Sequence, residues 1–199
     1  MFAYCGNNPV NCSDPSGNVP ISDFAYSAHS GIGRLKIKYD VPLYSQGKLK
    51  LCWAYCQLMI EDYHTGTTRT RTEADARAKE IAMAFHIALG KGCGKPTVEK
   101  QFWNAGATPE NAGDGSLPKG LLSLYLMLEN GPIYAYYWNG IPGSGAHMVV
   151  VTGVDVTSGL VYSNNPWGYS RAQTYSAFLN GVTGTYTDNM PLNSVMPLK

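Results

Sequence analysis

The sequence predicts an α+β fold, in which a helical part comes first and an antiparallel sheet follows. One stripe of side chains recurs at the helical spacing i, i+4, i+7 and i+11, at Cys52, Cys56, Met59 and Tyr63. Short β-branched and aromatic runs separated by turn residues begin only after Gly131-Pro132. Helices followed by strands, with no internal repeat, are typical of the α+β class.

The composition fits one domain with an appendage and argues against several kinds of partner. The chain has 199 residues, of which 44% are hydrophobic, and 15 basic and 14 acidic residues leave a net charge of +1. Without a basic excess, we expect no nucleic-acid partner. No run approaches the ~20 apolar residues of a membrane span, and the N-terminus lacks a signal-peptide pattern, so we expect no membrane partner. No Cys/His pair has zinc-ligand spacing, so we predict neither a metal nor another cofactor.

The helices are predicted from periodicity and from their end signals. For the second helix, Thr72 is the candidate cap, with Asp75 three residues later, and the helix runs through His86 to Leu89, before Gly90. The first strand and the other helices are expected, in order, over residues 34–39 (strand), 52–63, 97–104 and 118–129.

Three later runs predict the sheet, over residues 133–138, from His147 onward, and over residues 161–165. A turn centred near residue 156 joins the last two. In the simplest antiparallel hairpin of this kind, His147 lies opposite Asn165. At least half of an aromatic cluster on the first run is expected in the core: Tyr134, Tyr136, Tyr137 and Trp138.

Residues 46–55 have the pattern of a cysteine nucleophile that enters a helix. A thiol at a helix N-terminus lies near unpaired backbone N–H groups and the positive end of the helix dipole, and both favour the nucleophilic thiolate. Such a nucleophile needs a base, and the base needs a group that orients it. His147 and Asn165 are the candidates, because the predicted hairpin brings them together. For Cys52 alone, a buried structural cysteine is the simpler interpretation, and we adopt that interpretation for Cys56.

These residues resemble the papain-like cysteine peptidases, whose pattern is Gln…Cys-Trp-Ala, then His before a hydrophobic strand, then Asn-x-Trp. The resemblance implies that Gln46 is the oxyanion-hole glutamine, Cys52 the nucleophile and His147 the base. It implies that Asn165, the second of two adjacent asparagines, is the orienting amide, and that Trp167 is the indole that shields it. The implied fold is papain-like, with the nucleophile on the N-terminal helical part and the His and Asn on an antiparallel sheet.

The resemblance covers roughly residues 38–186 and departs from papain itself in two respects. The motif Cys-Gly-[Ser/Ala]-Cys-Trp is absent, and His147 follows Cys52 by 95 residues, against about 130–150 in papain. The Asn-Pro-Trp-Gly run resembles the Asp-Pro-x-Gly of the bacterial double-glycine leader peptidases of bacteriocin exporters. We therefore expect a small bacterial branch of the family that cuts after small residues such as Gly-Gly. The expected substrate-cleft residues are Trp53, Gly145 and Trp167.

Residues 2–17 are turn-rich and resemble the end of the core of Rhs/YD-repeat proteins, with Asn-Pro-Val-Asn followed by Asp-Pro-x-Gly. In that family the motif marks the border between an encapsulating shell and a variable C-terminal toxin. The resemblance implies the end of an Rhs-type core over residues 1–19, a linker over 20–36 and a papain-like peptidase toxin domain over 37–199. It also implies secretion from a producer cell as part of a larger Rhs-type protein, action in the target-cell cytoplasm, and a cognate immunity protein that covers the active site.

Three functions are compatible with the sequence. The first is a cysteine endopeptidase that acts as an antibacterial effector and cleaves a cytoplasmic protein of a target cell. The second keeps the same catalytic residues in a deamidase, transglutaminase or acyltransferase, since an amine as well as water can resolve a thioester. The third is a non-enzymatic end of a repeat protein, for which replacing Cys52 would change nothing.

Overall fold

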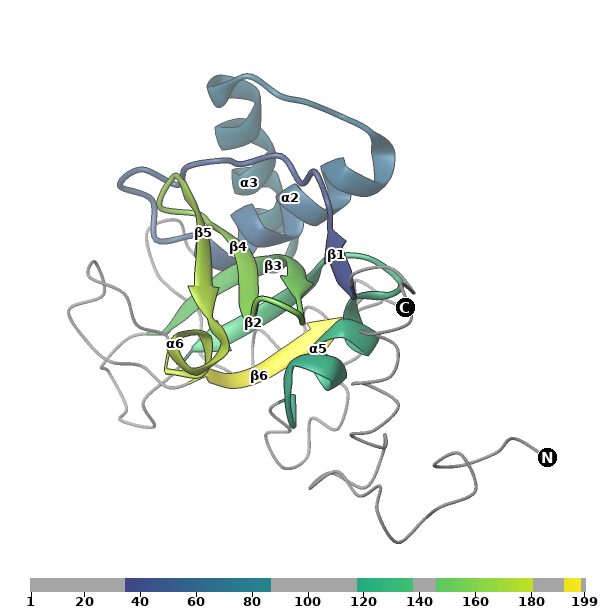
Figure 1. The fold of residues 1–199 in the computed structure, drawn as a ribbon. Helices are drawn as coiled ribbons and strands as arrows, with labels where there is room; N and C mark the ends of the chain where they lie inside the picture. Colours follow the sequence, from purple (N-terminus) through teal and green to yellow (C-terminus); the bar gives the residue numbers. More distant parts are fainter. Residues whose placement is uncertain (1–34, 87–117, 138–145, 181–191, 198–199) are drawn as a thin grey trace, which may run out of the picture. The chain divides into compact units, whose positions relative to one another are not determined.

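The computed structural model describes residues 35–86, 118–137, 146–180 and 192–197 (Figure 1). Predictions that fall elsewhere, including the helix over 97–104, Trp138, Gly145 and the segment 1–19, lie outside the described residues. The α+β prediction is confirmed, because helices precede an antiparallel sheet. The elements are β1 (Lys36–Lys38), α2 (Cys52–Thr65), α3 (Arg71–Ala84), α5 (Leu121–Leu128), β2 (Ile133–Tyr137), β3 (His147–Asp155), β4 (Leu160–Asn165), β5 (Tyr169–Thr174), α6 (Tyr175–Leu179) and β6 (Leu192–Pro197).

The sheet is built around β3, every residue of which is buried. Its order is β5-β4-β3-β2-β6, and all pairings are antiparallel. Strands β2 and β1 pair with the first and last parts of β3, while β4 pairs with it from Val150 to Asp155. A strand has two edges, so β1 and β2 lie end to end along one edge of β3 and β4 lies along the other. A side chain at Gly153 would overlap the Ile37 carbonyl oxygen, so glycine allows β1 to approach β3.

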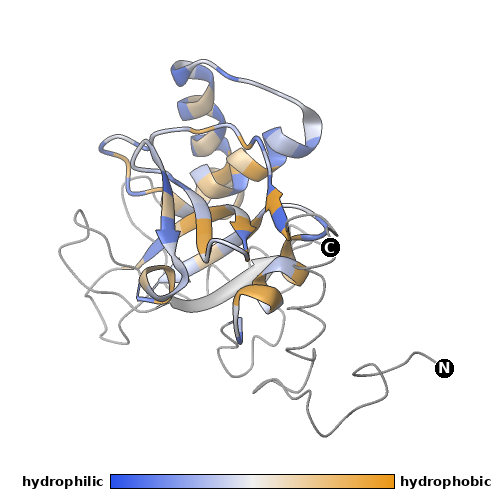
Figure 2. Cartoon of the chain, viewed as in Figure 1, coloured by the Kyte–Doolittle hydropathy of each residue, from blue (hydrophilic) through white to orange (hydrophobic). Residues whose placement is uncertain are grey.

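The helix that carries Cys52 is buried on most of its surface, with eight of its residues in the core. Helix α2 packs against β3, and α3 packs against α2 (Figure 1). Figure 2 shows hydrophobic residues gathered on the central strands and on the helices that contact them. Gly66 ends α2 in the left-handed conformation, at φ 65°, and its N–H bonds back to the carbonyls of Asp62 and Tyr63. The predicted helix over 52–63 is therefore confirmed, with two further residues.

The predicted cap and end of the second helix are wrong. Helix α3 begins at Arg71 because Thr70 caps it, in a capping box with Glu73. The Glu73 carboxylate reaches back to the Thr70 N–H at 2.8 Å, whereas the Asp75 carboxylate of the predicted box accepts a hydrogen bond from the Tyr55 hydroxyl instead. The helix ends at Ala84, and His86, at φ 56°, lies outside it.

The predicted hairpin between β3 and β4 is confirmed, but its register is wrong by two residues. The prediction placed Val150 opposite Tyr162, whereas Val150 pairs with Asn164. Asp155 and Leu160 close a loop over residues 156–159, so the turn is centred later than predicted. The register also shifts between Val151 and Gly153. Such a bulge has no counterpart in a simple alternation of side chains.

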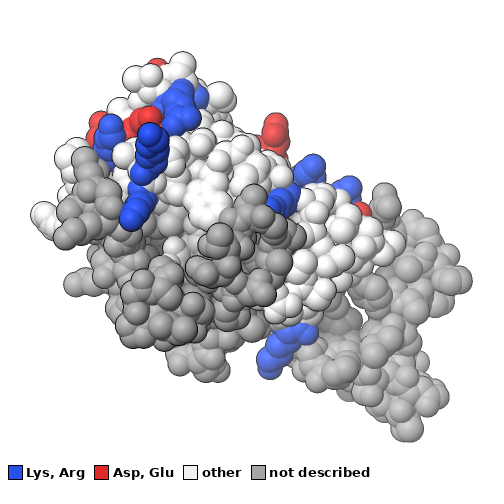
Figure 3. Space-filling model, turned by 90° about the vertical axis from the view of Figure 1, so that its left-hand side faces the viewer, with Lys and Arg blue, Asp and Glu red and all other residues white. Residues whose placement is uncertain are grey.

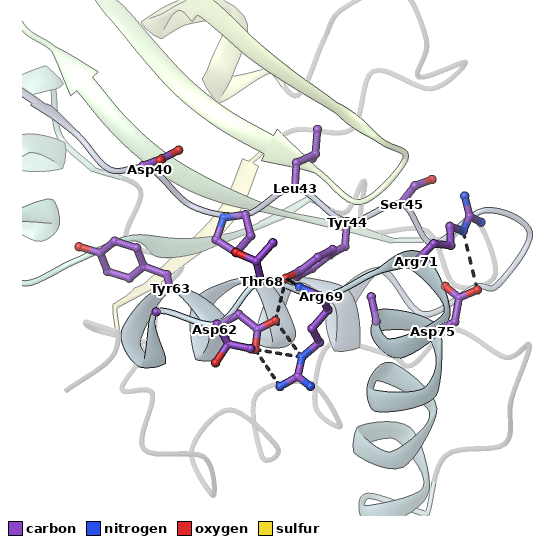
Figure 4. A pocket seen from close by; sticks show the side chains of 14 residues that line it. Asp40, Leu43, Tyr44, Ser45, Asp62, Tyr63, Thr68, Arg69, Arg71 and Asp75 are labelled. Carbon is purple, nitrogen blue, oxygen red and sulfur yellow. Dashed lines mark hydrogen bonds and ion pairs between the residues drawn. The ribbon is translucent and has the colours of Figure 1, made fainter.

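A buried ion pair holds the segment before Gln46 against the end of α2. The Asp62 carboxylate, fully buried, accepts bonds from Arg69 Nε at 2.9 Å and Nη2 at 3.0 Å. It also accepts a hydrogen bond from the Tyr44 hydroxyl at 2.8 Å, and that hydroxyl accepts one from the Arg69 N–H at 3.0 Å (Figure 4). The three groups therefore satisfy one another, and Tyr44 is fixed two residues before Gln46.

We predict that Asp62→Asn lowers the free energy of unfolding by about 2 kcal/mol, because it weakens the charge-assisted hydrogen bonds that the buried carboxylate accepts from Arg69, whose side chain is 26% exposed. The matched control is Arg77→Gln, which removes an ion pair with Glu61 whose two side chains are both about one-third exposed, and which should cost less than about 1 kcal/mol. Urea denaturation of both variants measures the difference. Equal losses would contradict a special role for the Asp62 network.

Candidate active site

Cys52 is the first residue of α2 and is partly exposed. Its own backbone N–H, that of Trp53 and that of Met148 lower the pKa of the thiol, as expected at the start of a helix. Withdrawal from water is the larger effect, and it raises the pKa above the ordinary value. The helix start therefore acts on the pKa of Cys52 in the expected direction, and the withdrawal of the sulfur from water opposes it.

His147 is the first residue of β3 and is only 3% exposed. Its Nε2 lies 3.0 Å from Asn165 Oδ1, and its ring packs against the Trp167 indole, with 4.5 Å between the ring centroids. Burial lowers the pKa of the imidazole to about 4, although the Asn165 oxygen acts in the opposite direction. At neutral pH the imidazole is therefore uncharged.

The Asn165 side chain fixes which ring nitrogen carries the proton. The Trp167 backbone N–H can only donate, and it lies 2.9 Å from Asn165 Oδ1. Asn165 Nδ2 donates to the Tyr169 hydroxyl at 2.8 Å. The amide oxygen therefore faces His147, whose Nε2 must carry the hydrogen, and Nδ1 is the acceptor of the neutral ring.

The structure distinguishes the two adjacent asparagines. Asn164 Nδ2 donates to the Val41 carbonyl at 2.8 Å, and its Oδ1 accepts from Ser170 Oγ at 2.7 Å. Asn164 therefore ties β4 to the segment before Gln46, and Asn165 is the residue that contacts His147. The sequence reasoning missed Tyr169. It pairs with Asn165 across a tight turn at Gly168, and that turn residue was the available signal.

Cys52 and His147 begin two elements that pack against each other, α2 and β3. The Met148 N–H that acts on the Cys52 sulfur belongs to the residue directly after His147. Cys52 in the helix, with His147 and Asn165 in the sheet, therefore fits a Cys-His-Asn triad.

Gln46 is 7% exposed and is held beside the turn that carries Trp167. Its N–H bonds to the Pro166 carbonyl at 2.6 Å, and a Cβ added to Gly168 would lie only 3.0 Å from the Ser45 side chain. The Gln46 Oε1 atom is buried without a hydrogen-bond partner among the described residues. Gln46 therefore lies beside the turn that follows Asn165, and its side-chain oxygen makes no hydrogen bond to the described residues.

The predicted cleft residues have different positions. Trp167 is 40% exposed and lies over His147. Trp53 is 1% exposed and packs edge-on against Phe85, with 5.9 Å between the ring centroids, so the prediction that its side chain lines a cleft is wrong. Trp53 is the residue after Cys52, and its side chain points toward Phe85 at the end of α3. Cys56 is fully buried, as expected of a core residue.

Two further observations concern the described residues as a whole. No three His, Cys, Asp or Glu side chains within them gather as a metal site would require. None of the helices seen in these ranges is both long and apolar enough to cross a membrane.

A cavity of about 590 Å³ lies between residues 40–45, the end of α2 and the start of α3 (Figure 4). Cys52, His147 and Asn165 are not among its lining residues.

A family model described as papain-like cysteine protease AvrRpt2 matches residues 35–182. No curated protein matches the chain. The matched range contains all three residues of the triad and Gln46.

We predict that His147 makes the protein lose stability in acid. The folded pKa of about 4 lies below the ordinary value of 6.5, so the unfolded chain takes up the proton first as the pH falls. Above pH 6.5 the titration of His147 does not reduce the free energy of unfolding. Between pH 6.5 and pH 4 it reduces that free energy by about 1.4 kcal/mol per pH unit. Urea denaturation at pH 7.5 and pH 5 should show a decline in wild type that His147→Gln largely removes. His64→Gln, at an exposed position, is the control, and parallel behaviour of all three proteins would contradict the prediction.

Proposed function

The chain belongs to the family described as papain-like cysteine protease AvrRpt2, and we propose on that basis that Cys52, His147 and Asn165 are its catalytic residues and that it is an endopeptidase. The observation that carries the assignment of residues is the bond between His147 Nε2 and Asn165 Oδ1. It presents Nδ1, the acceptor nitrogen, as the base, as the Cys-His pairing requires.

The proposed reaction begins from an uncharged pair. His147 Nδ1 accepts the Cys52 proton as the sulfur attacks the peptide carbonyl, because burial disfavours the separated thiolate and imidazolium. A tetrahedral oxyanion forms. When it collapses, the C–N bond breaks, His147 gives its proton to the leaving amine, and a thioester remains on Cys52. Water, deprotonated by His147, then hydrolyses the thioester and restores the thiol.

Two donors are proposed for the oxyanion. The first donor is the backbone N–H of Cys52. The first helical hydrogen bond of α2 runs from the Tyr55 N–H to the Leu51 carbonyl, so the Cys52 N–H, three residues earlier, has no carbonyl partner within the helix. The Gln46 side-chain amide is the second donor. This role is supported by the hydrogen bond from the Gln46 N–H to the Pro166 carbonyl, because Pro166 lies on the same turn as Trp167.

We predict that Gln46→Ala lowers kcat by about 10²–10³-fold with little change in KM, because the amide would act only on the developing oxyanion. Ser45→Ala, one residue earlier on the same segment, is the control and should retain near wild-type kcat. Steady-state kinetics on a cleaved peptide measure both. A rise in KM alone would assign Gln46 to substrate binding rather than to the oxyanion.

We further propose that this peptidase is the toxin domain of a larger Rhs-type protein. The support is the Rhs-like pattern at residues 2–17. In this proposal the producer secretes the larger protein, and the peptidase cuts a protein substrate in the cytoplasm of a target cell. The producer then needs an immunity protein, and a protein that covers the cleft at Cys52 and His147 would block the nucleophile and the base together.

The finer specificity rests on resemblance alone. Small residues such as Gly-Gly before the cut are expected from the likeness to double-glycine leader peptidases, and this stays a prediction. A deamidase, transglutaminase or acyltransferase could use the same thioester. Membership of a cysteine protease family favours water as the acceptor and peptides as substrates, and it excludes the non-enzymatic alternative.

We predict that the protein creates new N-termini in a bacterial lysate and that Cys52→Ala creates none, because the nucleophile is lost. Enrichment and sequencing of N-terminal peptides from the two treated lysates measures this. The residues before each cut then show whether small pairs are required. If no new termini form while an alkylating reagent still modifies Cys52, a search for glutamate products or cross-links would test the acyl-transfer alternative.

A further inference from the structure

The turn that leads to the nucleophile carries positive charge that no nearby acidic residue in the sequence offsets. Between Asp40 and Glu61 the chain contains no Asp or Glu. Lys48 and Lys50 lie within this stretch, and both are exposed. Lys50 precedes Cys52 by two residues, so the two Cα atoms are at most about 7 Å apart. The backbone of Lys50 is therefore close to Cys52, and its exposed ammonium is within reach of a substrate bound there.

The conformation of the turn holds Lys48 outward. The Leu49 N–H bonds to the Gln46 carbonyl at 3.0 Å, which makes residues 46–49 a β-turn. Gly47 occupies its second position at φ 56°, a conformation that glycine adopts without strain. Lys48 follows at the third position of the turn and is exposed, whereas Gln46 is buried.

A third cation reaches the same turn from α3. The Arg71 Nη2 atom lies 2.5 Å from the place where a Cβ would stand on Gly47, so the missing side chain provides the room that the guanidinium occupies. The Arg71 side chain is 62% exposed, and its ion pair with Asp75 is long, at 3.8 Å. Figure 4 shows the pair at the end of the cavity near Ser45. On the face drawn in Figure 3, Lys and Arg are more prominent than Asp and Glu.

The turn at residues 46–49 is attached, through Gln46, to the turn that carries Trp167 beside His147. His147 protonates the leaving amine in the proposed reaction, and Trp167 lies over His147. The Gln46 N–H is bonded to the Pro166 carbonyl, directly before Trp167 in the chain. In the proposed reaction the amine leaves beside His147, so the substrate residues that follow the scissile bond would lie near Trp167 and the turn at residues 46–49.

We propose that Lys48, Lys50 and Arg71, here called the basic rim, select substrates with an Asp or Glu side chain within the first three residues after the scissile bond. This inference rests on the proposed peptidase function and names a substrate class for it. Three cations on one rim attract a carboxylate over several ångströms, and the attraction weakens as salt screens it. The overall net charge of +1 conceals this local excess.

The direct test uses a library of peptides made by digesting a bacterial proteome, with cut sites identified by mass spectrometry. Wild type should show acidic residues after the cut at about threefold or more above their frequency in the library. Lys48→Glu/Lys50→Glu should lose this enrichment and favour Lys or Arg there. Lys119→Glu, an exposed lysine beside α5, is the control and should keep the wild-type profile. Enrichment that is absent in wild type, or that persists in the double variant, overturns the proposal.

A second test does not require proteolysis. Iodoacetate and iodoacetamide alkylate the same thiolate, but only iodoacetate is negatively charged. The ratio of their rates at Cys52, with Cys52→Ser as the background, should fall about threefold or more in the double lysine variant and should not change in Lys119→Glu. The effect should shrink at 1 M salt. If wild type cuts no library peptide, the peptidase proposal fails. The ratio of the two alkylation rates then tests separately whether the basic rim attracts anions: a lower ratio in the double variant supports this, and an unchanged ratio overturns it.

Discussion

The active site depends on the side-chain amide of Asn165. Its oxygen accepts from two donors, the Trp167 backbone N–H and His147 Nε2, and its nitrogen donates to the Tyr169 hydroxyl. Because one of these partners is a backbone donor, the amide cannot turn over without losing that bond. The histidine tautomer is therefore set by the backbone conformation of the turn after β4. The role proposed for His147 as the base depends on this tautomer.

The same turn joins the two parts of the fold. Its Pro166 carbonyl accepts from the Gln46 N–H, and the neighbouring Asn164 amide binds the Val41 carbonyl. Residues 41–46 run from β1 toward α2, so these two bonds attach the segment before the nucleophile to the strand that carries Asn165. On its other side, the same segment is held by Tyr44 through the buried Asp62–Arg69 pair. The positions of the proposed oxyanion donors thus depend on contacts from both the helices and the sheet.

The features that could be predicted from sequence were those set by local pattern. The period of α2 follows from its apolar side chains, β3 and β4 from β-branched runs, and the triad residues from motifs at the ends of those elements. The features that could not be predicted depend on competition between neighbours. Thr70 and Thr72 are both plausible caps, and the longer Glu73 side chain decides between them. The bulge beside Val151 and the late turn before Leu160 shift a register that alternation alone leaves undetermined. Tyr169 contacts Asn165 only because the turn at Gly168 brings β5 back alongside β4.

The pKa of Cys52 could not be predicted from the local sequence, because two opposing effects act on its sulfur. The start of α2 provides N–H groups that lower the pKa of Cys52, and a sequence argument can foresee them. The withdrawal from water of the partly exposed Cys52 and the buried His147 opposes ionisation of each, and it arises only when α2 packs against β3. An uncharged pair costs less to bury than an ion pair, so the site can stay close-packed before substrate arrives. Charge then develops only when the thiol attacks, at the place where the Cys52 N–H and the Gln46 amide can act on the oxyanion. The proposed basic rim lies outside this buried region, where its exposed lysines are accessible to a substrate carboxylate.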